Sequence, residues 1–113
     1  MDAVFKTPLT PDDVKNQAKA FGADLVGIAD GKVMDEFPPD PANPRRPSDV
    51  TDYDGGRAIV LGKRLLSGPT RLTRWNERHK YYNDEITLTM LEEAALEMVL
   101  WLEGQGYPAL IIP

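Results

Sequence analysis

Two adjacent tyrosines, Tyr81 and Tyr82, are the side chains of this sequence best suited to binding a ligand. A phenol ring can line the pocket of a planar cofactor, and its hydroxyl can donate a hydrogen bond. Trp75 lies shortly before them and would add an indole ring to the same region. The alternative is that these rings pack around the start of a long helix. We take Tyr81 and Tyr82 as candidate cofactor-binding residues and keep the packing role open.

A basic segment leads into the tyrosines. Lys63–Lys80 contains six cations and a single acid, Glu77, although the whole chain carries a net charge of −5. Such a segment can contact phosphates, a nucleic-acid backbone or an acidic partner, whereas the negative net charge argues against nucleic acid as the main partner. A solvated, salt-bridged start of a helix explains the pattern equally well. The candidate contact residues are Arg71, Arg74 and Arg78.

No metal-binding residue is predicted. His79 is the only histidine, and no second ligand follows at a metal-binding spacing. Glu92, Glu93 and Glu97 would form a carboxylate face on a helix, but a metal there needs ligands from other helices, so a solvated face is the simpler interpretation. The chain has no cysteine, which excludes a disulfide, a thiolate zinc site and a cysteine-ligated iron–sulfur cluster within these residues.

The composition predicts a soluble α/β protein of one domain or part of one. The chain has 113 residues, of which 42 % are hydrophobic, enough to form a small core. The first ten residues lack the basic start and apolar run of a signal peptide. No apolar stretch is long enough to span a membrane. We therefore expect a cytoplasmic protein with no membrane partner.

The first half of the chain predicts a helix, a strand and a long irregular connection. Thr10 is a suitable N-cap for a helix from Pro11 to Phe21, and Gly22 ends it. The apolar run 25–29 predicts a strand buried on both faces. Residues 31–56 contain five prolines and predict an irregular loop, with single helical turns possible near 32–37 and 48–50.

The second half predicts a strand over 57–62, a helix over 75–103 and a third strand over 109–112. The helix carries apolar residues over a broad sector, which implies that it is covered by a sheet and by something more. This order gives an α/β (α+β) class with about three strands and two main helices. Because the sequence stops directly after the third strand, we expect an incomplete domain that is truncated or completed by a partner.

Three blocks of the sequence, taken in order, resemble a known family. They are Phe21–Asp30 (FGADLVGIAD), then Arg46–Val50 (RPSDV) with Gly56–Gly62 (GRAIVLG), and finally the stretch from Leu91 (LEEAAL) through 101–109 (WLEGQGYPA) to Pro113. This series is similar to the N-terminal segment of the epoxyqueuosine reductase and reductive dehalogenase family, whose members are corrinoid- and iron–sulfur-dependent. The resemblance spans residues 11–113; no single block is diagnostic, and the order and spacing of the blocks carry it.

The resemblance implies that residues 1–113 are the N-terminal segment of a nitroreductase-like domain that holds cobalamin. It also implies a following ferredoxin-like module with two 4Fe-4S clusters, and the reductive removal of a halide or of an epoxide oxygen. The substrate would then be a tRNA nucleoside or a small organic molecule, and the basic segment a tRNA contact. Tyr81 and Tyr82 fall near the aromatic residues that face the family's active site.

The chain departs from complete members of the family in lacking their cysteine motifs and later catalytic acid. No catalytic residue is therefore assigned, and the clusters would come from the rest of the domain or from a partner subunit. The alternative function is a stand-alone interaction or regulatory domain with the same scaffold and no chemistry of its own. The two hypotheses differ in whether the chain contributes to binding cobalamin.

Overall fold

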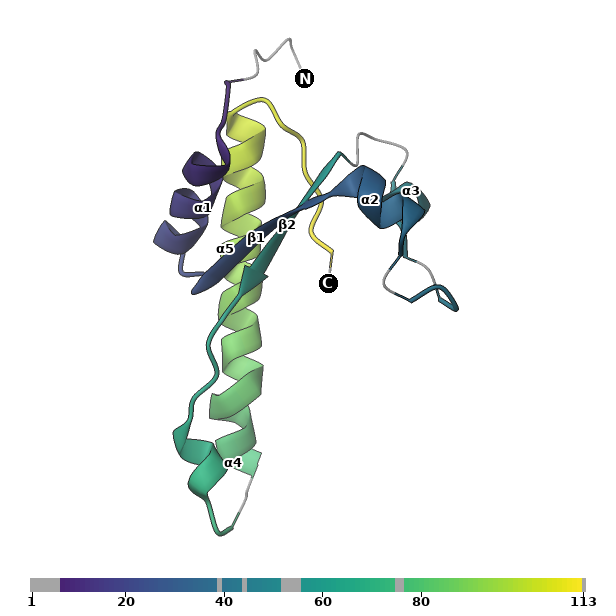
Figure 1. The fold of residues 1–113 in the computed structure, drawn as a ribbon. Coiled ribbons are helices and arrows are strands. Elements are labelled where there is room, and N and C mark those ends of the chain that lie inside the picture. The colour runs from purple at the N-terminus through teal and green to yellow at the C-terminus, as the bar shows by residue number, and fades with distance from the viewer. Residues whose placement is uncertain (1–6, 39, 44, 52–55, 75–76, 113) are drawn as a thin grey trace. The chain divides into compact units, whose positions relative to one another are not determined.

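The computed structural model describes residues 7–38, 40–43, 45–51, 56–74 and 77–112 (Figure 1). It divides into two compact units. The first comprises Met1–Val26 with Leu61–Pro113, and the second comprises Gly27–Val60. The protein combines helices with a two-stranded sheet, which confirms a mixed helix-and-strand class.

The first helix, α1 (Pro11–Ala20), forms as the sequence predicts. The Thr10 hydroxyl accepts a hydrogen bond from the Asp13 amide at 3.1 Å, and the Asp13 carboxylate accepts one from the Thr10 amide at 3.0 Å. This reciprocal capping box satisfies two amides that the helix itself leaves without partners. Beyond the helix, Gly22 has a φ of +111°, a conformation that favours glycine.

The sheet consists of β1 (Leu25–Asp30) and β2 (Arg57–Gly62). The Asp24 amide donates to the Gly62 carbonyl at 2.9 Å, and the Gly31 amide donates to the Gly56 carbonyl at 3.1 Å, so the strands are antiparallel. The positions of both strands are confirmed. The predicted burial of β1 on both faces is wrong for this chain, because the Leu25 side chain remains 72 % exposed. Val60 of β2 is also 58 % exposed.

The second unit contains two short helices within the proline-rich segment. These are α2 (Gly31–Glu36) and α3 (Pro47–Val50), close to the helical turns expected inside an otherwise irregular loop. The Asp35 carboxylate accepts hydrogen bonds from the amide and the hydroxyl of Ser48, both at 3.1 Å. The Asp35 carbonyl accepts another from Arg46 Nε at 3.1 Å. These bonds tie α2 to α3.

The predicted long helix is present but is interrupted by a change of helical pitch. Its described part consists of α4 (Glu77–Lys80), a π-helical turn η2 (Tyr81–Glu85) and α5 (Ile86–Gly104). A short 3₁₀ turn, η1 (Gly68–Arg71), precedes it. Trp75 lies outside the described residues.

The core of the first unit lies between α1 and α5, which run side by side in Figure 1. Small and flexible side chains fill it, which lets the two helices approach closely. Its buried apolar residues are Val14, Ala18, Ala23, Ala94, Met98 and Leu102. Other apolar residues of α5 are not covered, since Leu88, Leu96 and Leu100 are at least half exposed.

The predicted third strand does not form within the described part of the chain. After α5, the Tyr107 amide donates to the Leu102 carbonyl at 2.9 Å, and the Tyr107 hydroxyl donates to the Thr7 carbonyl at 2.9 Å. Residues 108–112 then continue without regular secondary structure. Leu110 and Ile112 are 63 % and 64 % exposed. A strand needs a neighbour to accept its backbone hydrogen bonds, and no described strand supplies them.

No helix in the described ranges combines the length and the apolarity that crossing a membrane requires.

Candidate functional site

The π-helical turn η2 carries both candidate tyrosines. The Tyr81 and Tyr82 rings meet edge to face, with their centroids 5.3 Å apart and an interplanar angle of 71°. Consecutive residues of an α-helix diverge by about 100°, so the wider turn helps to bring these two rings together. Both side chains are nearly half exposed. They therefore form an accessible aromatic surface and do not pack in the core.

Arg78 joins this aromatic pair from the preceding turn. Its Nη2 donates to the Tyr82 hydroxyl at 2.8 Å, and its guanidinium carbon lies 5.5 Å from the centroid of the Tyr82 ring. The first contact is a hydrogen bond and the second a cation–π interaction. Arg78, a candidate partner-contact residue, thus lies against Tyr82, a candidate cofactor-binding residue. The two are four residues apart, and helical side chains at this spacing are neighbours.

The other two candidate arginines take no part in the contacts described for the Arg78–Tyr82 pair. Arg71 ends η1 and Arg74 follows it, and both side chains are exposed. Within the described residues neither side chain forms an ion pair or a hydrogen bond with another side chain. Among the described interactions, only Arg78 of the three candidate arginines contacts the tyrosine pair.

Lys80 is held by two carboxylates of η2. Its ammonium lies 3.0 Å from the Glu85 carboxylate and 3.8 Å from that of Asp84. The hydrogen bond that Lys80 donates to the Glu85 carboxylate, with the negative charges of Asp84 and Glu85, raises the pKa of Lys80 above its usual value. The charges of Lys80, Asp84 and Glu85 thus partly neutralise one another.

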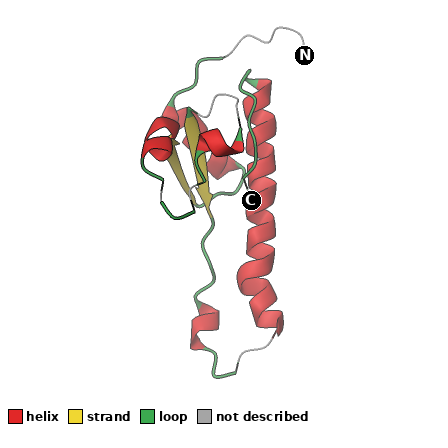
Figure 2. Ribbon diagram, turned by 90° about the vertical axis from the view of Figure 1, so that its right-hand side faces the viewer, coloured by secondary structure: helices red, strands yellow, loops and turns green. Residues whose placement is uncertain are grey.

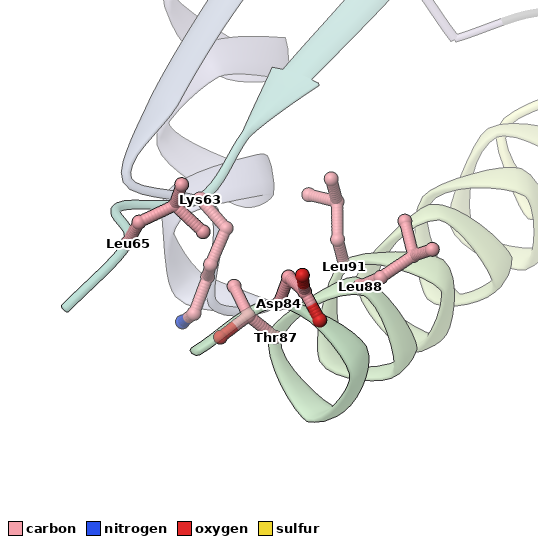
Figure 3. A pocket seen from close by; sticks show the side chains of 6 residues that line it. All are labelled: Lys63, Leu65, Asp84, Thr87, Leu88 and Leu91. Atoms are coloured by element: carbon pink, nitrogen blue, oxygen red, sulfur yellow. The ribbon is translucent and has the colours of Figure 1, made fainter. Parts of the chain in front are cut away.

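A hollow of about 260 Å³ opens beside η2 (Figure 3). Lys63 and Leu65 line it from the segment after β2, and the other lining residues come from η2 and α5: Asp84, Thr87, Leu88 and Leu91. Three leucines make this hollow mainly apolar. One oxygen of Asp84 is buried beside it, and among the described residues its closest ionic partner is Lys80, too distant for a hydrogen bond.

Sequence reasoning missed the residues of this hollow. The sequence pattern gives no role to Asp84, and it places the leucines in a broad apolar sector that something else covers. The π-helical turn changes which residues share a face, and its position is not encoded by any simple spacing. Lys63 was noted only as one cation of the basic segment. Its ammonium donates to the Gly22 carbonyl at 2.7 Å, which anchors the segment beside α1.

A bound corrinoid does not fit this hollow. Pockets for drug-sized ligands occupy about 300–1,000 Å³, and a corrinoid is larger than most such ligands. The part of the chain that the structure describes also contains no group of three or more His, Asp or Glu side chains placed to hold a metal ion.

Comparisons with protein-family models, with curated proteins and with solved structures found no match to this chain. The family resemblance and the nitroreductase-like arrangement therefore stay predictions from the sequence blocks.

Proposed function

We propose that this chain is the scaffold segment of a corrinoid-dependent iron–sulfur reductase and works only when a second polypeptide segment completes its sheet. The completed protein would act in the cytoplasm and remove a halide or an epoxide oxygen reductively. The 4Fe-4S clusters would be held by the completing segment, since this chain has no cysteine. The function rests on the order of the sequence blocks, and the need for completion rests on the structure.

The observation that carries the need for completion is the unfinished sheet. Leu25 of β1 and Val60 of β2 leave more than half of their side chains in water. The apolar residues 110–112 are exposed as well, and none of them pairs with a described strand. Burying an apolar side chain of this size contributes about 1.5–3 kcal/mol, so a segment that covers these residues gains a large driving force.

The candidate ligand residues have a limited part in this proposal. Tyr81 and Tyr82 would offer an aromatic wall to the cofactor or the substrate once the second segment closes the site. Arg78 would hold the Tyr82 ring in its present orientation through the 2.8 Å hydrogen bond. Arg71 and Arg74 stay available for a phosphate or an acidic partner, including a tRNA substrate.

The experiment is a titration with hydroxocobalamin and cob(II)alamin, followed by absorbance. It is run on the chain alone and on the chain mixed or co-expressed with a candidate completing segment that supplies the cysteines this chain lacks. We expect no binding to the chain alone and saturable binding to the pair. Ile112→Asp should weaken assembly of the pair, whereas Glu36→Ala, an exposed substitution in α2, should not.

Absence of cobalamin binding in both preparations would overturn the proposal. A pair that assembles but binds no cobalamin would favour the interaction or regulatory domain instead. Binding by the chain alone would contradict the need for completion.

A further inference from the structure

The charges of the first unit are segregated between two neighbouring segments. The stretch 63–74 contains four cations and no acid, and α5 contains four acids and no cation. The cations are Lys63, Arg64, Arg71 and Arg74, and the acids are Glu92, Glu93, Glu97 and Glu103. None of these eight side chains belongs to an ion pair within the described residues. The first unit thus carries two charge patterns of opposite sign, and no described ion pair neutralises either of them.

Exposed leucines accompany both charge patterns. Leu65, Leu66 and Leu72 lie among the cations and are between 38 % and 53 % exposed. On α5, Leu96 and Leu100 follow Leu88 and Glu92 at intervals of four residues, so they form one ridge along the helix. Glu93 and Glu97 lie beside this ridge. Each surface therefore offers apolar contacts bordered by a single sign of charge.

The positions of the two surfaces along α5 make the chain complementary to itself. Residues 63 and 65 line a hollow with Asp84, Thr87, Leu88 and Leu91, so the basic segment lies beside the N-terminal part of the helix (Figures 1 and 3). The acidic residues and the exposed Leu96 and Leu100 lie further along it. If two copies place their α5 helices in opposite directions, each basic segment faces the acidic half of the other copy.

We propose that this chain forms a two-fold symmetric dimer in which residues 64–74 of each copy bind the α5 ridge of the other. A two-fold axis uses each complementary pair of surfaces twice, so the contact closes and does not propagate. Arginines contact glutamates, and leucines cover leucines. The negative end of the α5 dipole adds to the attraction for the partner's cations. The inference uses the outer face of α5 and does not depend on cobalamin or on the completion of the sheet.

The test is sedimentation velocity of the full chain over a range of concentrations, in salt of about 0.1 M and about 1 M. The Debye length falls from about 10 Å to about 3 Å between these conditions. We expect a concentration-dependent dimer whose dissociation constant rises at high salt. Reversing either charge pattern should weaken the dimer about tenfold or more, because attractions become repulsions. The variant that reverses the acidic pattern of α5 is E92R/E93R/E97R. The variant that reverses the basic pattern is R64E/R71E/R74E.

Mixing the two reversed variants provides the decisive arm. Each variant alone should be largely monomeric, and the mixture should form a heterodimer because both of its contacts pair opposite charges. One contact is the wild-type pair, and the other pairs the introduced glutamates with the introduced arginines. The control pair, Lys32→Glu and Glu36→Arg in α2, should leave the dimer unchanged. Circular dichroism spectra of all variants verify that the helices are intact.

Two results would overturn the inference. One is a chain that stays monomeric up to its highest soluble concentration at low salt. The other is a dimer whose dissociation constant is unchanged by both charge reversals, which would place the interface elsewhere. Neither result bears on the proposed corrinoid function, whose test is the cobalamin titration of the completed pair.

Discussion

The Arg78 guanidinium and the Tyr82 hydroxyl are joined by a 2.8 Å hydrogen bond across the junction of α4 and η2. This bond connects the basic segment to the aromatic pair, two features that the sequence presents as separate. It also gives Tyr82 an anchor that the neighbouring Tyr81 hydroxyl does not share among the hydrogen bonds described. The two tyrosines should therefore respond differently to the loss of their hydroxyls.

Tyr82→Phe should lower the free energy of unfolding by about 0.5 kcal/mol, at the low end for a hydrogen bond because the contact is exposed. Tyr81→Phe is the matched control and should have a smaller effect. Urea denaturation followed by circular dichroism measures both. Equal stabilities for the two variants would mean that the Arg78 bond contributes nothing in solution.

Removing the capping hydroxyl of α1 should destabilise the first unit. Thr10→Ala loses the bond to the Asp13 amide and should cost about 1 kcal/mol, whereas Thr10→Ser keeps an acceptor and should cost less. Urea denaturation again supplies the measurement. An alanine variant as stable as the serine variant would show that α1 does not depend on this cap.

Stability should also depend on pH through Asp13. Hydrogen bonds from the backbone amide and the side chain of Thr10 hold the pKa of Asp13 below its usual value. A carboxyl group whose pKa is lower in the folded state stabilises that state at pH values above its unfolded-state pKa. This contribution is lost as the pH falls through the folded-state pKa. Acid titration of wild type and Asp13→Asn should differ in this acidic window. Parallel stability curves below pH of about 4 would contradict the prediction.

Two methionines of α5 differ in burial, one on the covered face of the helix and one on an exposed face. Met98 is buried, and Met90 is about half exposed on the same helix. Met98→Ala should cost about 2–4 kcal/mol because it leaves a cavity, and Met90→Ala should cost less than about 1 kcal/mol. Thermal or urea unfolding at low protein concentration compares them. Similar losses for both would place the core elsewhere.

The sequence predicts those elements whose determinants are local. The α1 cap, the positions of β1 and β2, and the short helices in the proline-rich segment follow from residues within a few positions of each other. Burial is not local in this sense. Leu25 and Val60 have the pattern of buried strand residues, yet their exposure depends on which surfaces are present to cover them.

The sequence by itself determined the absence of cysteine ligands, the segregation of charge and the apolar run at 109–112. Only the tertiary structure decided that this run lacks a strand partner among the described residues, that η2 brings Arg78 to Tyr82, and that Lys63 and Asp84 line one hollow. Side-chain types and their spacing specify helices and strands, whereas pairing and shared surfaces depend on residues far apart in the chain. Those long-range contacts are set by packing and not by any short-range pattern.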